Sequence, residues 1–237
     1  MTITPITGIV FDKDGTLFDF NATWGCWAGL LIAELAAGDA ARHSALCETL
    51  GYDTIAKAFQ PGSIVIAETV QTVSSAILPH LPAGTERTAL IARMNALAAD
   101  VPQVAAAPLP DFVSGLAARG LRLGVATNDA EAPARAHLAR AGVLDGFDFV
   151  AGYDSGFGGK PAPGQLQAFC TRFSLAPESC VMVGDSLHDL HAGRALGMHT
   201  VGVLTGPALH DELAPHADAV LPSIAALPDW LDQVSRA

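Results

Sequence analysis

Short apolar runs alternate with helix-like segments from residue 108 onward. The apolar runs lie at 121–126, 147–151, 180–183, 200–204 and 219–221. Helical patterns lie between them, at 111–119, 131–141, 163–174 and 188–196. Alternating strands and helices predict a parallel sheet with helices on both faces, and uninterrupted Val, Ile and Leu runs are typical of strands buried on both faces. We therefore predict an α/β fold built on a doubly wound parallel sheet.

The stretch from residue 18 to residue 107 interrupts this rhythm. It follows directly after the first apolar run, at residues 9–11, and it is rich in Ala and Leu with few strand signals. Glycines and prolines divide it into four or five expected helices, with breaks at Gly51, Pro61–Gly62, Pro79, Pro82 and Pro102. The pattern predicts a core of residues 1–17 and 108–237, into which residues 18–107 insert as a helical domain.

Composition narrows the function further. Of 237 residues, 50% are hydrophobic and 16% are charged, which is ample material for a buried core, and the formal net charge is -11. An acidic chain with so few lysines and arginines is not expected to bind nucleic acid. No signal peptide or membrane span is visible, so we expect a cytoplasmic protein without a membrane partner. The four cysteines show no CxxC spacing and are expected to be small buried thiols, with Cys170 and Cys180 in buried segments.

Polar residues of a consistent kind follow four of the predicted strands. In chain order they are Asp12 and Asp14, Thr127 and Asn128, Lys160, and then Asp185 with Asp189. Because the carboxyl ends of parallel strands meet at one edge of a sheet, we expect these side chains to converge there. The sequence thus predicts a site with several carboxylates, one ammonium group and small hydroxyl and amide groups.

This set of residues suits phosphoryl transfer. Carboxylates one residue apart, like Asp12 and Asp14, repel each other unless a cation lies between them or one is protonated. A phosphate would also be repelled by carboxylates alone, so a hard divalent cation such as Mg²⁺ is expected. One carboxylate then attacks phosphorus, a second acid protonates the leaving oxygen and later activates water, and Lys160 balances the charge.

These residues resemble the motifs of the haloacid dehalogenase superfamily. The family's DxDGT motif corresponds to Asp12–Thr16, its strand-end Thr or Ser to Thr127, its basic residue before a proline to Lys160, and its GDxxxD motif to residues 184–189. All four motifs occur in order. The resemblance implies a Rossmann-like core, and it implies that residues 18–107 form a helical cap domain of the kind found in the phosphoglycolate phosphatase-like branch.

The resemblance also implies roles for the individual residues. Asp12 is the expected nucleophile and a Mg²⁺ ligand, and Asp14 is the expected general acid/base, with its backbone carbonyl on the metal. Thr127 and Asn128 are expected to hold the transferring phosphoryl group, and Lys160 to steady nucleophile and phosphate. The expected second carboxylate ligand is Asp185. The last acid of the set, Asp189, is expected to act through water or by orienting its neighbours.

Several reactions within this superfamily remain open. Haloacid dehalogenases lack the acid that Asp14 provides, and P-type ATPases carry a Thr there, so Asp14 favours a phosphatase or a phosphomutase. A phosphonatase would need a cap lysine to form a Schiff base, and Lys57 is the only one. A phosphate-binding protein without turnover is a further alternative. We favour hydrolysis of a small phosphate monoester such as phosphoglycolate, by a monomer or homodimer.

Other residues receive plainer interpretations. We expect Lys13 to point away from the phosphate and to be structural. The pair His188 and His191 is expected at the surface and not at a metal. Trp24 and Trp27 are expected to be core or cap-interface residues; as an alternative, Trp24 lies close enough to the start of the insert to face a substrate. The cations of the insert are candidates to meet a substrate carboxylate; they are Lys57, Arg42, Arg87 and Arg93.

Overall fold

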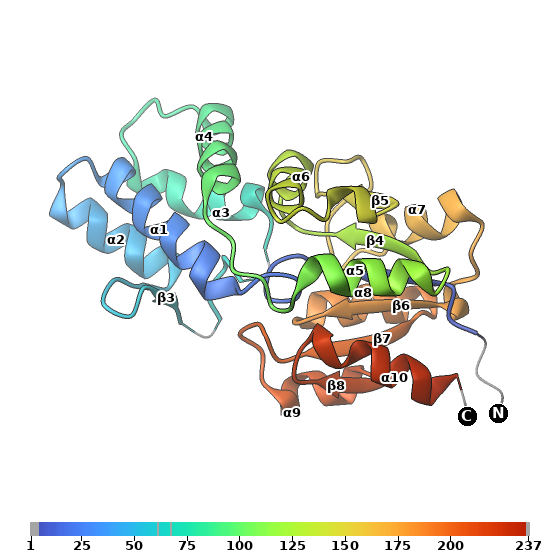
Figure 1. Ribbon diagram of the computed structural model, residues 1–237. Coiled ribbons are helices and arrows are strands. Elements are labelled where there is room, and N and C mark those ends of the chain that lie inside the picture. Colours follow the sequence, from blue (N-terminus) through green and yellow to red (C-terminus); the bar gives the residue numbers. More distant parts are fainter. Residues whose placement is uncertain (1–4, 61, 67, 236–237) are drawn as a thin grey trace.

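A computed structural model describes residues 5–60, 62–66 and 68–235. It contains the predicted parallel sheet, with six strands in the order β5-β4-β1-β6-β7-β8 (Figure 1). The strands are β1 (Gly8–Phe11), β4 (Arg122–Ala126), β5 (Phe149–Ala151), β6 (Cys180–Gly184), β7 (His199–Val203) and β8 (Ala219–Leu221). Every neighbouring pair in this sheet is parallel. The α/β fold with a doubly wound sheet is therefore confirmed.

The first strand lies in the middle of the sheet. Val10 of β1 is in register with Gly124 of β4 on one side and with Met182 of β6 on the other. The chain first builds outward through β4 and β5, and then crosses over to build β6, β7 and β8. The strand order thus reverses beside β1, and ligands of open α/β sheets bind at the carboxyl ends of the strands at this point.

Helices cover both faces of the sheet because successive side chains of a strand point to opposite faces. Ile9 and Phe11 belong to one hydrophobic cluster, and Val10 between them belongs to another. The first face is covered by α5 (Leu109–Ala118), α6 (Glu131–Arg140) and α10 (Leu227–Val234). The second face is covered by α7 (Gly164–Phe173) and α8 (Leu187–Leu196). The four predicted helices agree with α5, α6, α7 and α8 within two residues, whereas α9 (His210–Leu213) and α10 were not predicted.

The inserted residues 18–107 have a hydrophobic cluster of their own, which includes Trp27, Leu46 and Met94. Its α-helices are α1 (Phe20–Ala36), α2 (Ala40–Leu50), α3 (Val70–Ile77) and α4 (Arg87–Asp100). Local sequence sets their ends: the Asp39 carboxylate caps α2 by accepting the Arg42 N–H, and Gly51 ends it with a left-handed φ of 60°. A short antiparallel hairpin follows, which the sequence did not predict, because its strands β2 (Tyr52–Asp53) and β3 (Ala58–Phe59) are too short for a periodic pattern.

Two chain segments side by side connect the insert to the sheet. The Asp19 N–H donates to the Val104 carbonyl at 2.7 Å, and the Ala106 N–H donates to the Leu17 carbonyl at 2.9 Å. The separate hydrophobic clusters and this paired connection support the predicted division into a core of 1–17 and 108–237 and a cap of 18–107, which stays a prediction. Its residues 1–4 and 236–237, and the predicted break at Pro61, lie outside the described residues.

The structure also bears on the predicted lack of a membrane span and on the predicted burial of the cysteines. Across the described part of the chain, no helix combines the length and the apolar character that crossing a membrane requires. All four cysteines are free, and Cys170 and Cys180 are buried as expected. Cys47 is only half-buried and Cys26 is exposed, so the expectation of buried thiols is wrong for these two. Both lie on helices of the insert, whose faces the sequence pattern did not assign.

Candidate active site

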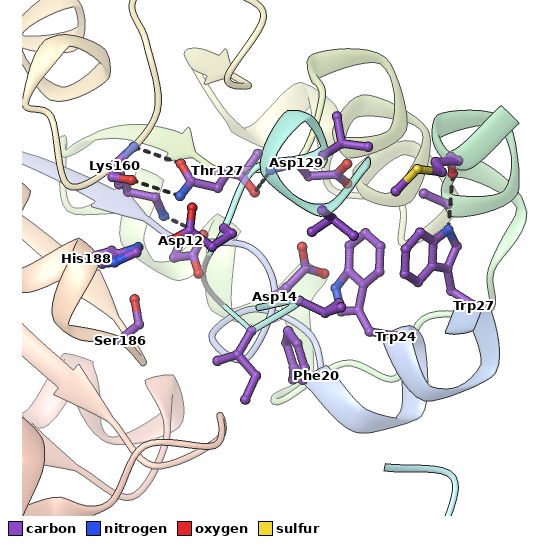
Figure 2. Close-up of a pocket in the computed structure, with 18 of the residues that line it drawn as sticks. Asp12, Asp14, Phe20, Trp24, Trp27, Thr127, Asp129, Lys160, Ser186 and His188 are labelled. Carbon is purple, nitrogen blue, oxygen red and sulfur yellow. Dashed lines mark hydrogen bonds and ion pairs between the residues drawn. The ribbon is translucent and has the colours of Figure 1, made fainter. Parts of the chain in front are cut away.

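The predicted site residues meet at the carboxyl edge of the sheet, beside the end of β1. The Lys160 ammonium lies 2.7 Å from Oδ1 of Asp12 and 2.6 Å from Oδ1 of Asp189 (Figure 2). All three side chains are buried. Burial alone would lower the pKa of Lys160, but Asp12 and Asp189 raise it by more, so the net shift is upward and the ammonium stays charged.

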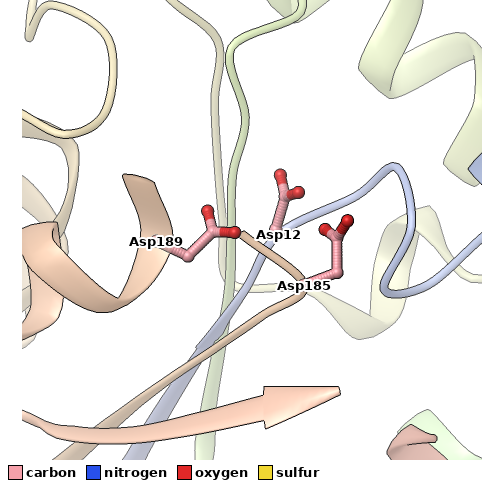
Figure 3. Close-up of side chains that lie close together, drawn as sticks. All are labelled: Asp12, Asp185 and Asp189. Carbon is pink, nitrogen blue, oxygen red and sulfur yellow. The ribbon is translucent and has the colours of Figure 1, made fainter. Parts of the chain in front are cut away.

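Three buried carboxylates share this place (Figure 3). Asp12, Asp185 and Asp189 each offer one oxygen, and these oxygens lie within 4.8 Å of one another. Burial raises the pKa of Asp12 to about 7, with Asp189 adding to the rise and Lys160 opposing it. Burial, followed by repulsion from Asp12, raises the pKa of Asp185 well above its usual range. One ammonium cannot neutralise three carboxylates, and oxygen ligands at this spacing fit a hard divalent cation.

The carboxylates differ in how much of their binding capacity is already used. Oδ2 of Asp189 accepts hydrogen bonds from the backbone N–H and the hydroxyl of Ser186 at 3.0 and 2.7 Å, as part of a capping box at the start of α8. Because its other oxygen accepts from Lys160, Asp189 is mainly an anchor for its neighbours. Among the described side chains, the Thr16 hydroxyl is the one that donates to Asp185, at 3.3 Å. Asp12 and Asp185 are thus the freer pair of ligands.

Glycines permit the chain to approach Asp185 closely. A β-carbon at Gly15 or at Gly206 would overlap the Asp185 carboxylate. Gly15 also has a φ of 79°, which favours glycine, and its carbonyl accepts a 2.6 Å hydrogen bond from the Thr205 hydroxyl. The turn after Asp14 and the loop after β7 therefore enclose Asp185 between them.

The loop that carries Lys160 is held by the second strand-end motif. The Asn128 amide donates to the Lys160 carbonyl at 2.9 Å, and the Lys160 N–H donates to Oδ1 of Asn128 at 2.7 Å. Gln165 of α7 donates to the Thr127 carbonyl at 3.0 Å. Thr127 and Asn128 both line the pocket, so they lie where the resemblance expects phosphate contacts. In addition, Asn128 fixes the backbone of the lysine, which the sequence did not indicate.

Lys13 belongs to a buried network beside the pocket and does not line the pocket itself. Its ammonium lies 2.8 Å from Asp14, 3.1 Å from Asp129 and 2.9 Å from Nδ1 of His137. An ammonium can only donate, so Nδ1 of His137 accepts, and its Nε2–H donates to the Ala98 carbonyl of α4 at 2.6 Å. The network therefore joins the predicted acid/base to a helix of the insert.

The pocket itself is enclosed by the core and the insert together. Trp24 and Phe20 of α1 line it with the acidic residues of the core (Figure 2). Trp24 and Trp27 both line the pocket, so the alternative position for Trp24, facing a substrate site, agrees with the structure. His191 is exposed as expected, whereas His188 is half-buried and lines the pocket. Helix α8 begins at Leu187 directly beside the pocket, and this placed His188 there.

The cations of the insert lie elsewhere. Arg42 donates to carbonyls of α1, Arg87 donates to Ser74 and Gln71, and Arg93 pairs with Glu34. Lys57 is exposed and has a left-handed φ of 53°. None of these four cations is among the residues that line the pocket. The candidates for meeting a substrate carboxylate are thus turned toward the helices or the solvent.

The parallel sheet with a pocket at the point where its strand order reverses defines this protein as a doubly wound α/β protein with a ligand site of the kind such sheets carry. Residues 6–197 match the family model described as haloacid dehalogenase-like hydrolase, and the chain belongs to that family. The resemblance seen in the sequence is thereby confirmed.

Individual relatives agree with this assignment. The chain is 30% identical to a phosphoglycolate phosphatase of Nitrosospira multiformis over 93% of each protein. It is 36% identical to a phosphoglycolate phosphatase of Rhodospirillum rubrum over 62% of each protein. A crystal structure of a predicted phosphoglycolate phosphatase from Haemophilus somnus superposes with a TM-score of 0.76 at 18% identity, covering 96% of this chain and 99% of the other. At that identity the superposition supports the fold alone.

Proposed function

We propose that this hydrolase is a Mg²⁺-dependent phosphatase, which hydrolyses a small phosphate monoester through an aspartyl-phosphate intermediate on Asp12. Its family and its relatives named phosphoglycolate phosphatases support an enzyme that acts on phosphoric monoesters. The observation that carries the mechanism is the position of Asp12, which lies at the end of the central strand, lines the pocket and contacts Lys160.

The proposed reaction has two steps. An Asp12 carboxylate oxygen attacks phosphorus, the bond from phosphorus to the ester oxygen breaks, and Asp14 gives its proton to the departing alcohol. Water then attacks the aspartyl phosphate, Asp14 takes a proton from that water, and Asp12 is released together with inorganic phosphate. Throughout, Lys160 offsets the negative charge on Asp12 and on the phosphoryl oxygens.

Asp12 and Asp185 would hold the metal, with Asp189 orienting Lys160 and Ser186 beside it. When bound, Mg²⁺ would supply positive charge that lowers the repulsion between these carboxylates and a phosphate. The carboxylate of Asp14 is held by Lys13, so its expected contribution to the metal site comes from its backbone carbonyl. Thr127 and Asn128 remain the proposed contacts of the phosphoryl group.

Three other functions of this fold would use the pocket differently: a phosphonatase, a sugar-phosphate mutase and a binding protein without turnover. A phosphonatase needs a cap lysine at the reacting carbon, and Lys57 is exposed outside the pocket. A sugar-phosphate mutase would use the same Asp12 and Asp14, and it differs in returning the phosphoryl group to the sugar. A binding protein without turnover would not need Lys160 beside a nucleophile.

Phosphate release from p-nitrophenyl phosphate tests the proposal. We expect Mg²⁺-dependent release that Asp12→Asn lowers by at least about a thousandfold while the fold is retained. Mass spectrometry of rapidly quenched enzyme should find phosphate on Asp12. A folded protein that releases no phosphate from a broad panel of esters with Mg²⁺ contradicts the proposal. An isomeric sugar phosphate in place of free phosphate would establish the mutase instead.

A further inference from the structure

The wall of the pocket that comes from the insert is mostly apolar, with Asn95 and Glu68 as its polar members. Its members include Phe20, Trp24, Val65, Ile66, Val70 and Met94. The phosphoryl group is proposed to sit at the opposite, polar wall, formed by the core. The alcohol part of the substrate must therefore lie against the apolar residues of the insert.

On the insert side of the pocket, the charge is negative. Across the part of the insert that the structure describes, Glu68 is the only charged residue that lines the pocket, and no lysine, arginine or histidine does. On the core side Asp14 and Asp129 line it as well, and Lys160 is engaged by Asp12 and Asp189. A second anion beside the insert would meet carboxylates and no lysine or arginine of the described insert, and the imidazole of His188 lines the pocket on the core side.

Trp24 adds a polar feature to the apolar wall. Its Nε1 is buried and has no hydrogen-bond partner within the described residues. The neighbouring Trp27 differs, because its Nε1 donates to the Met94 carbonyl at 3.1 Å. Buried indole N–H groups usually have a partner, so the Trp24 N–H is available to an oxygen of the ligand. Neutral groups such as this indole and the Asn95 amide do not offset the cost of burying a carboxylate.

We propose that the substrate is a phosphate monoester whose alcohol part is uncharged and presents an apolar, ring-sized face to Trp24. This inference rests on the proposed phosphatase function and names the substrate class of the same site. It departs from phosphoglycolate, whose carboxylate would have to lie beside Glu68. The similarity to phosphoglycolate phosphatases is consistent with this, because the chemistry belongs to the core and the selectivity to the insert.

Matched pairs of esters test the proposal on the full-length enzyme with Mg²⁺. One pair is 2-hydroxyethyl phosphate and phosphoglycolate, and the other is benzyl phosphate and 4-carboxybenzyl phosphate. We expect kcat/KM to be at least about tenfold higher for the uncharged member of each pair. We also expect kcat/KM to be higher for benzyl phosphate than for 2-hydroxyethyl phosphate, and we expect Trp24→Leu to reduce that difference.

A charge variant sharpens the test. Glu68 is exposed at the pocket rim, so Glu68→Gln should fold normally. It should raise kcat/KM for the two phosphate esters that carry a carboxylate by about threefold to tenfold. Glu68→Lys should raise it further. Glu48→Gln is the matched control, because Glu48 is an exposed acid of the insert that does not line the pocket, and it should change nothing.

The results distinguish a failure of the proposed substrate class from a failure of the proposed phosphatase function. If a phosphate ester that carries a carboxylate is hydrolysed as fast as its uncharged partner, or faster, the substrate class proposed here is wrong and the phosphatase function stands. If neither these esters nor p-nitrophenyl phosphate is hydrolysed by the folded protein with Mg²⁺, the proposed function fails, and the substrate class fails with it.

Discussion

The Lys13 ammonium turns back onto its sequence neighbour Asp14 and contacts both carboxylate oxygens, at 2.9 Å and 2.8 Å. The Lys13 side chain has no exposed surface, whereas 11% of the Asp14 side chain is exposed. Burial lowers the pKa of Lys13, but Asp14 and Asp129 raise it by more, so the ammonium stays charged. Lys13 thus fixes the proposed acid/base from the side away from the pocket.

Removing this lysine should destabilise the protein strongly. We expect Lys13→Met to lower the free energy of unfolding by about 3 kcal/mol or more, because it leaves the Asp14 and Asp129 carboxylates buried without their cation. Urea denaturation measures this change. The double variant Lys13→Met with Asp129→Asn should recover part of the loss, and Arg93→Ala, which breaks an exposed ion pair, should have little effect. A Lys13→Met protein as stable as the parent contradicts the structural role.

Asp14→Asn should separate the two steps of the proposed reaction. The first step with p-nitrophenyl phosphate needs no proton from Asp14, because the nitrophenolate leaves readily without one. The second step loses its general base, which contributes about a hundredfold to ten-thousandfold. Stopped-flow absorbance should therefore show a burst of nitrophenol close to one equivalent per enzyme, followed by slow turnover. Steady turnover at the parent rate, with no burst, would remove Asp14 from the proposed role.

Metal binding should be visible in thermal stability without any measurement of activity. We expect Mg²⁺ to raise the melting temperature of the parent protein, because a ligand that binds only the folded state stabilises it. Asp185→Asn should abolish that increase. In the presence of a chelator the same variant should melt higher than the parent, since it removes a buried carboxyl group whose ionisation is opposed by burial and by Asp12 and Asp189. An undiminished Mg²⁺ effect in Asp185→Asn would exclude Asp185 as a ligand.

His137 should make stability fall in mild acid. The pKa of His137 is lowered from 6.5 to about 4, mainly by burial and then by the nearby Lys13 and Arg140, with Asp14 opposing the shift. Between these two pH values the unfolded chain binds the proton more readily, so the free energy of unfolding decreases as the pH falls, by at most about 3 kcal/mol.

Urea denaturation between pH 7 and pH 4 checks this expectation. His137→Gln should flatten the pH profile, because its amide carries no charge at either end of the range. His191→Gln changes an exposed histidine and is the matched control. A His137→Gln profile as steep as that of the parent would assign the acid sensitivity to other groups.

Local sequence patterns were enough to predict the sheet and the set of residues at its edge. Parallel strands buried on both faces require continuous apolar runs, so the runs before Asp12, Thr127 and Asp185 were readable as strands. Strand ends share one edge, so their polar residues could be placed together without coordinates. The family resemblance then rested on motifs whose residues lie close together in the sequence. The strands β2 and β3 were not predicted, because they are too short for a periodic pattern.

Only the tertiary structure decided which charges face the pocket. Lys13 meets His137 across 124 positions of sequence, and His137 in turn meets Ala98 of the insert, so no local pattern could reveal the network. The cations of the insert were visible in the sequence, but α2 and α4 turn its three arginines away from the site, and Lys57 is exposed between β2 and β3. Side-chain direction depends on how the helices pack, and packing is a property of contacts between residues distant in the chain. The chemistry of the site was therefore readable from the sequence, whereas its apolar, acid-rimmed pocket was not.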